Sequence, residues 1–139
     1  MWLVDTSVWI LTFQRGGPSL EDLVPIDEVV TALPVIQEVL QGFRDERAFR
    51  TARESMLALP LVEPTFAADL MVDAAQLYRA ARRAGITPRS SVDCLIATCA
   101  IRHHIPVLHA DRDYDALTRV SALVARNIAP STSSYDPPL

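Results

Sequence analysis

Lysine is absent from this sequence, because all 13 of the cationic residues among its 139 are arginines. This absence excludes mechanisms that need a catalytic lysine or a lysine that grips a nucleotide phosphate, including the P-loop. The net charge of -4 also argues against non-specific binding of nucleic acid through a broad basic surface. A nucleic-acid enzyme is still compatible with this balance, because an acidic catalytic centre can outweigh basic contacts nearby.

Long apolar runs and a plausible cysteine pair are missing as well. No apolar run approaches the ~20 residues that a membrane span requires. No basic segment precedes the apolar residues at the N-terminus, so we expect no secretory signal and no membrane association, and we expect a cytoplasmic protein. Cys94 and Cys99 lie five residues apart and point to different sides of one expected helix. We therefore expect two small buried apolar residues rather than a disulfide or a metal site.

The rest of the composition suits one folded domain, since half of the residues are apolar. Apolar runs predict strands over 2–5, 28–31, 61–63, 106–110 and 122–125. The sequence predicts helices over 6–13, 34–43, 45–59, 67–84, 90–104 and 114–120. Apolar residues at helical spacing mark those over 34–43 and 90–104, whereas the helix over 45–59 is polar. Thr6 or Ser7 is expected to cap the first helix, and Ser90 or Ser91 the fifth.

This alternation indicates an α/β fold with a short, mostly parallel sheet of four to five strands flanked by helices. We expect a single domain over residues 1–128. Residues 129–139 are rich in proline and serine, which is typical of a loose tail.

Carboxylates follow or flank apolar elements in four separate segments. Asp5 ends the first expected strand, and Asp111 and Asp113 follow the strand over 106–110. In parallel sheets, functional groups collect beyond the carboxyl ends of the strands, so these positions are informative. Glu38 lies beside the apolar face of the helix over 34–43, and Asp93 lies in the first turn of the helix over 90–104.

Each carboxylate alone has a purely structural explanation. Asp5 could help to cap the following helix, and Asp93 could complement a helix dipole, an effect of roughly 0.3–1 kcal/mol. Glu38 could be an exposed helix charge, and the aspartates after residue 110 could form a solvated turn. If the carboxylates converge, however, their repulsion costs on the order of several kcal/mol unless a cation lies among them. Oxygen ligands alone favour a hard cation, Mg²⁺ or Mn²⁺.

Four motifs in order carry a family resemblance: VDTSVWI, IQEVLQG, SVDCLIATCAI and VLHADRDYDAL. Together they resemble the PIN-domain ribonucleases and, more narrowly, the VapC toxins of bacterial toxin–antitoxin pairs. The resemblance covers the chain before its tail. It implies a Mg²⁺-dependent endoribonuclease, with Mn²⁺ as a substitute, that cleaves transfer RNA or another structured RNA by a metal-activated water.

The resemblance also assigns the site residues. It gives catalytic and metal-binding roles to Asp5, Glu38, Asp93, Asp111 and Asp113. It gives Thr6 a role in supporting the metal site. The last family motif often has phenylalanine after its second acid, whereas this chain has Tyr114.

The resemblance predicts the protein partners, and one residue indicates a contact with the RNA substrate. The resemblance implies a homodimer and a VapB-like antitoxin that blocks the acidic pocket, for which a basic side chain is physically apt. Arg112 lies inside the acid-rich segment, and we expect it to contact a substrate phosphate. Asp115 is expected on the solvent side of the helix that follows.

Two other interpretations compete with this one. An EF-hand would begin as Asp111-x-Asp113-x-Asp115 but needs glycine at its sixth position and glutamate at its twelfth, where this chain has alanines. A catalytically silent PIN-like module that docks a protein partner or RNA remains open. The full set of acids argues against it.

Overall fold

The computed structural model describes residues 1–129. Apart from Ala129, the expected tail over 129–139 therefore lies outside the described residues. Four parallel strands form one sheet in the order β2-β1-β3-β4. Their bounds are Trp2–Val4 (β1), Val29–Val30 (β2), Val107–His109 (β3) and Ala125–Asn127 (β4).

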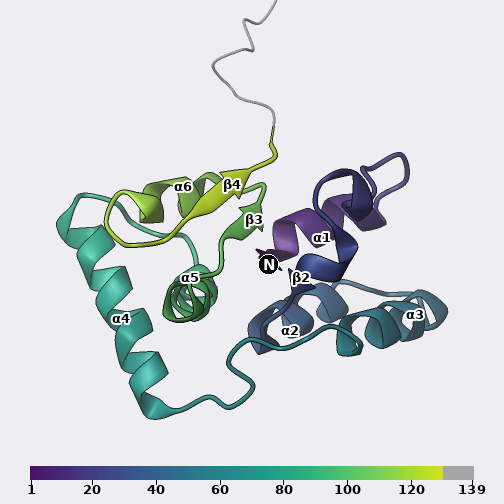
Figure 1. The fold of residues 1–139 in the computed structure, drawn as a ribbon, viewed down its shortest axis with the longest axis horizontal. Helices are drawn as coiled ribbons and strands as arrows, with labels where there is room; N and C mark the ends of the chain where they lie inside the picture. The colour runs from purple at the N-terminus through teal and green to yellow at the C-terminus, as the bar shows by residue number, and fades with distance from the viewer. Residues whose placement is uncertain (130–139) are drawn as a thin grey trace, which may run out of the picture.

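Six α-helices flank this sheet in the described part of the chain. They are α1 (Thr6–Phe13), α2 (Leu33–Gln41), α3 (Glu46–Leu57), α4 (Ala68–Arg83), α5 (Ser91–His103) and α6 (Arg112–Thr118). Short 3₁₀ turns cover Leu20–Asp22 and Ile26–Glu28. Figure 1 shows α4 and α5 on one side of the molecule and α1, α2 and α3 on the other. The predicted α/β fold with a parallel sheet is confirmed.

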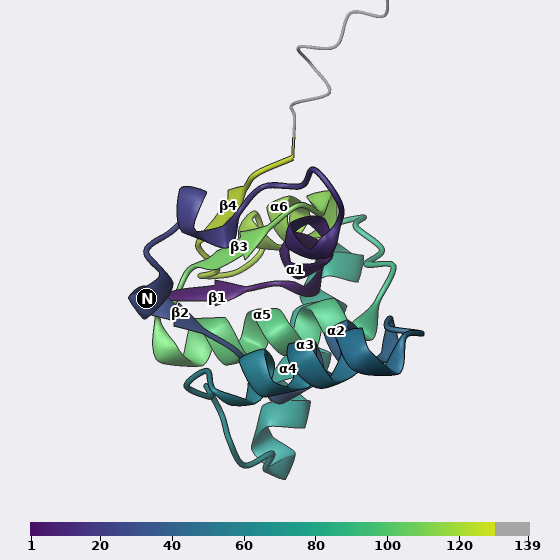
Figure 2. The same cartoon turned by 90° about the vertical axis from the view of Figure 1, so that its right-hand side faces the viewer.

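The core lies between the strands and the helices that cover them. Leu3 and Val4 of β1 and Val107 and Leu108 of β3 have no exposed surface, because both faces of these central strands are covered. Figure 2 shows β1 lying along α5 and leading into α1. Cys94 and Cys99 are buried and free, as predicted. Within residues 1–129, no helix is both long and apolar enough to span a bilayer.

Three element predictions are wrong in detail. The last strand is Ala125–Asn127 rather than 122–125, because this edge strand pairs only with β3 and exposes Arg126 and Asn127. An edge strand needs no continuous apolar run. The strand expected over 61–63 is a single bridge between Leu61 and Thr31. The helix expected over 114–120 is Arg112–Thr118. It begins two residues before the expected start because Asp111 is its N-cap.

Candidate active site

Asp5 stands at the carboxyl end of β1 and is the N-cap of α1. The expectation that Thr6 or Ser7 would cap this helix is therefore wrong. The Asp5 Oδ2 atom accepts hydrogen bonds from the Ser7 backbone N–H at 3.0 Å and from the Ser7 hydroxyl. Its Oδ1 atom accepts from the Tyr114 hydroxyl at 2.6 Å. Donors on both oxygens fix this buried carboxylate at the edge of the sheet.

Glu38 reaches the same edge from the middle of α2. Its Oε1 atom accepts a hydrogen bond of 2.9 Å from the Thr6 hydroxyl. Burial of this half-buried carboxyl raises its pKa above the ordinary value, the Thr6 hydrogen bond lowers it, and the charge of Asp5 raises it further. Thr6 therefore orients Glu38 beside Asp5.

Asp93 occupies the first turn of α5 and is buried, with 9% of its surface exposed. Ser90 is the N-cap of this helix and accepts from the Val92 backbone N–H at 3.1 Å. Burial is the largest cause that raises the pKa of Asp93 to about 7. The other causes are the negative charges of Asp5, Asp111, Glu38 and Asp113. All of the predicted site carboxylates thus lie in one electrostatic neighbourhood.

Asp111 and Asp113 come from the start of α6. Asp111 is the N-cap of this helix, and its Oδ1 atom accepts from the Asp113 backbone N–H at 3.0 Å. One carboxylate oxygen each of Asp93, Asp111 and Asp113 lies within 4.8 Å of the others. We call these three residues the carboxylate triad. Asp5 and Glu38 lie outside this triad, although their charges act on Asp93.

The arginine in contact with these acids is Arg89, which the sequence did not single out. Its Nη2 atom donates to Asp111 Oδ1 at 2.7 Å, and its Nε atom donates to Asp113 Oδ2 at 3.1 Å. The Arg89 backbone N–H also donates to Asp113 Oδ2 at 3.3 Å. Arg112 is exposed and makes no side-chain hydrogen bond or ion pair within residues 1–129. The available sequence signal was the position of Arg89 directly before the cap of the Asp93 helix.

His109 lies beneath the site, fully buried at the end of β3. Its Nδ1 atom accepts from the Asp111 backbone N–H at 3.2 Å, and its Nε2 atom lies 3.4 Å from Asp115 Oδ1. Burial lowers the pKa of His109 by more than the neighbouring carboxylates raise it, so the ring is neutral at pH 7. Asp115 faces His109 and Asn127 rather than the carboxylate triad.

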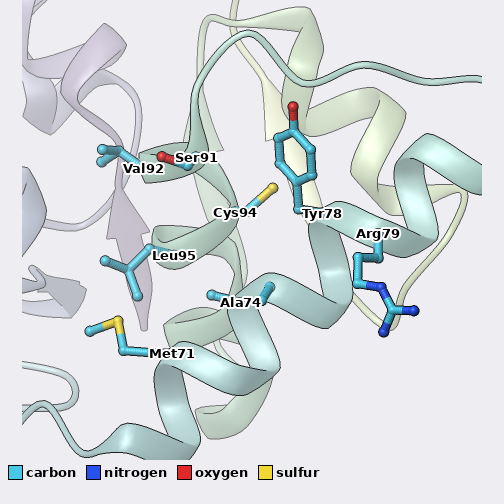
Figure 3. A pocket seen from close by; sticks show the side chains of 9 residues that line it. Met71, Ala74, Tyr78, Arg79, Ser91, Val92, Cys94 and Leu95 are labelled. Carbon is cyan, nitrogen blue, oxygen red and sulfur yellow. The ribbon is translucent and has the colours of Figure 1, made fainter.

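The opposite side of the α5 N-terminus borders a separate cavity of about 480 Å³ between α4 and α5. Figure 3 shows Cys94 and Leu95 of α5 near Met71 and Tyr78 of α4. Its lining contains no carboxylate. The first turn of α5 thus separates an apolar cavity from the acidic site.

Comparison with known proteins identifies the family of this chain. The model of the PIN domain family matches residues 2–120, which include every predicted site carboxylate. The match defines the class of the protein, a PIN domain. The chain is 37% identical over 131 residues to Ribonuclease VapC11 of Mycobacterium tuberculosis and to VapC ribonuclease Mb1587 of Mycobacterium bovis. Each alignment covers 90% of this chain and 97% of the relative. The chain therefore belongs to the VapC group of PIN-domain proteins.

Solved structures show the same fold. DNA-bound VapBC from Salmonella typhimurium matches with a TM-score of 0.73 at 15% identity, over 91% of this chain and 96% of that chain. VapBC-5 from Mycobacterium tuberculosis matches with a TM-score of 0.68 at 24% identity, over 91% of this chain and 97% of that chain. At such low identity, these likenesses establish the fold alone.

Proposed function

We propose that this protein is a metal-dependent endoribonuclease and the toxin of a VapBC-type pair. The observation that carries the proposal is the convergence of carboxylates from four segments around Asp93, whose pKa is raised to about 7. Crowded carboxylates destabilise a fold unless a cation offsets their repulsion. The relatives that are named ribonucleases support RNA as the substrate.

The carboxylate triad fits a hard divalent cation. Its donor atoms are all carboxylate oxygens within 4.8 Å of one another, which suits Mg²⁺ or Mn²⁺. The Arg89 guanidinium donates to two of these side chains, a contact that supports their suitability for a positive charge. A bound Mg²⁺ would supply a Lewis acid and a water of lowered pKa for phosphodiester hydrolysis.

The residues of the site would have different roles. Asp93, Asp111 and Asp113 would hold the ion. Thr6 would keep Glu38 oriented toward it, while Ser7 and Tyr114 would keep Asp5 in place. Arg112, exposed at the start of α6, would contact a phosphate of the RNA. Cleavage would leave a 5′-phosphate and a 3′-hydroxyl, with transfer RNA or another structured RNA as the expected target.

A VapB-like antitoxin and a second copy of the chain are the proposed partners. The support comes from the solved neighbours, which are VapBC complexes, some of them bound to DNA. We also keep the prediction of a cytoplasmic location. Sequencing the 5′-phosphate ends that appear when the protein is induced in cells would identify the RNA.

The test compares Asp93→Asn and Asp5→Asn with the wild type in RNA cleavage with Mg²⁺ and with EDTA. Both substitutions keep the shape of the side chain and remove its charge. We expect each to lower the rate by at least ~10- to 100-fold, as for residues that ligate or orient a metal. Asp27→Asn is the matched control, because Asp27 is an exposed carboxylate in the turn Ile26–Glu28.

Wild-type cleavage by Asp93→Asn, or cleavage that persists in EDTA, would contradict the proposed mechanism. Metal binding without cleavage of any RNA would favour the silent PIN-like binding module instead.

A further inference from the structure

Arg89 belongs to the loop between α4 and α5, yet it binds two carboxylates at the start of α6. The partners lie 22 and 24 residues further along the chain. The side chain is 61% exposed, so the contact is made at the open rim of the site. Its planar fork of N–H donors matches a pair of carboxylate oxygens better than a lysine ammonium would.

The guanidinium uses the same residues that the proposed metal site needs. Asp111 and Asp113 are two of the three members of the carboxylate triad. The Arg89 guanidinium and a divalent cation cannot both bind Asp111 Oδ1 and Asp113 Oδ2 strongly at the same time, because the two positive groups repel one another.

We infer that Arg89 is a built-in counter-ion that competes with the divalent cation for Asp111 and Asp113. This inference rests on the proposed function, because it assumes that the carboxylate triad binds metal. Arg89 neutralises part of the acidic site in the metal-free protein, and metal binding releases its side chain. The competition lowers the metal affinity of the free protein.

Substitutions of Arg89 can remove the guanidinium without removing the contact that the loop backbone makes with the site. The Arg89 backbone N–H binds Asp113 independently of the side chain, so replacing the side chain leaves the backbone anchor in place. Arg112 supplies a matched comparison. It lies between the two aspartates in sequence and carries the same charge, but its side chain makes no polar contact in the described part of the chain.

The experiment measures the Kd for Mn²⁺ by titration calorimetry or by electron paramagnetic resonance. The proteins are the wild type, Arg89→Gln, Arg89→Lys and Arg112→Gln. We expect Arg89→Gln to lower the Kd roughly three- to tenfold, the range expected for losing two solvent-exposed ion pairs. Arg89→Lys keeps the charge but loses the fork, so we expect a smaller decrease. Arg112→Gln should change the Kd by less than about twofold, because screening weakens a charge that makes no contact.

A second measurement follows the Arg89 side chain directly. In nitrogen-15 NMR spectra, the Arg89 Nε–H signal of the wild type should shift and lose protection from exchange as Mg²⁺ is added. The signal of the exposed Arg112 should change less. Both readouts are independent of RNA cleavage.

The outcomes separate this inference from the proposed function. Metal binding by the wild type with the same or a higher Kd in Arg89→Gln would overturn the competition and leave the metal site standing. Equal effects of Arg89→Gln and Arg112→Gln would also overturn it, because only general charge would then matter. If neither the wild type nor Arg89→Gln binds Mn²⁺, the metal site itself fails, and the inference fails with it.

Discussion

The carboxylate of Asp5 depends on a residue at which this chain departs from the usual family motif. Tyr114 is fully buried and donates its hydroxyl hydrogen bond to Asp5 Oδ1 at 2.6 Å. Burial raises the pKa of the Tyr114 hydroxyl well above its ordinary value, so the group remains protonated and remains a donor. A phenylalanine at this position would fill the same space without that donor.

We therefore predict that Tyr114→Phe lowers the free energy of unfolding by about 1–3 kcal/mol, the cost of leaving a buried acceptor without its partner. Urea unfolding in EDTA measures this loss. Tyr78→Phe is the control, because it deletes the same atom from a half-buried ring beside the apolar cavity between α4 and α5. Equal losses in the two variants would show that the Asp5 hydrogen bond contributes nothing specific.

At the scale of elements, the N-terminal cap of α5 and a carboxylate of the candidate site share the first turn of that helix. Ser90 fixes this turn by accepting from the Val92 N–H, and Asp93 stands on the same turn. We predict that Ser90→Ala lowers the free energy of unfolding by about 1 kcal/mol and raises the Kd for Mn²⁺, because the cap holds Asp93 in place.

Asp45→Ala is the matched control for that prediction. Asp45 caps α3 through the Ala48 N–H at 2.8 Å, away from the carboxylate triad. Its loss should cost similar stability, measured by urea unfolding, and leave the Kd unchanged. A wild-type Kd in Ser90→Ala would show that the remainder of α5 positions Asp93 without the cap.

The helices and strands also show which features of the fold and the site could be predicted from the sequence. The short buried strands β1 and β3 were predictable from their apolar runs, and Asp5 and Asp111 were predictable as candidates for the site because they follow those runs. The edge strand β4 was misplaced because its exposed residues carry no apolar pattern. Arg89 was missed because periodicity does not set the direction of a side chain in a loop. Its partners are defined only when α5 and α6 pack together.

For the whole molecule, Asp93 links global stability to pH. Its pKa is raised from 3.8 to about 7 in the folded protein. Between about pH 4 and 7, the folded state therefore holds a proton that the unfolded state has released, and the free energy of unfolding falls as pH rises through this window. The loss is complete above pH 7, where folding must tolerate an ionised carboxylate among other carboxylates.

A divalent cation should reverse this dependence. Metal binds the ionised carboxylates of the folded state only, so its stabilising effect grows as pH rises, reaching about 2.7 kcal/mol at 100 times the Kd. We predict that Asp93→Asn, in EDTA at pH 8, is more stable than the wild type by an amount on the order of a few kcal/mol. Saturating Mg²⁺ should narrow this difference, because the variant lacks a ligand and gains less stability from the metal. Urea unfolding from pH 4.5 to 8.5 measures both effects. Parallel wild-type and Asp93→Asn curves in EDTA would show that Asp93 ionises in the folded protein as it does in the unfolded chain, and the electrostatic case for a cation among these carboxylates would then fail.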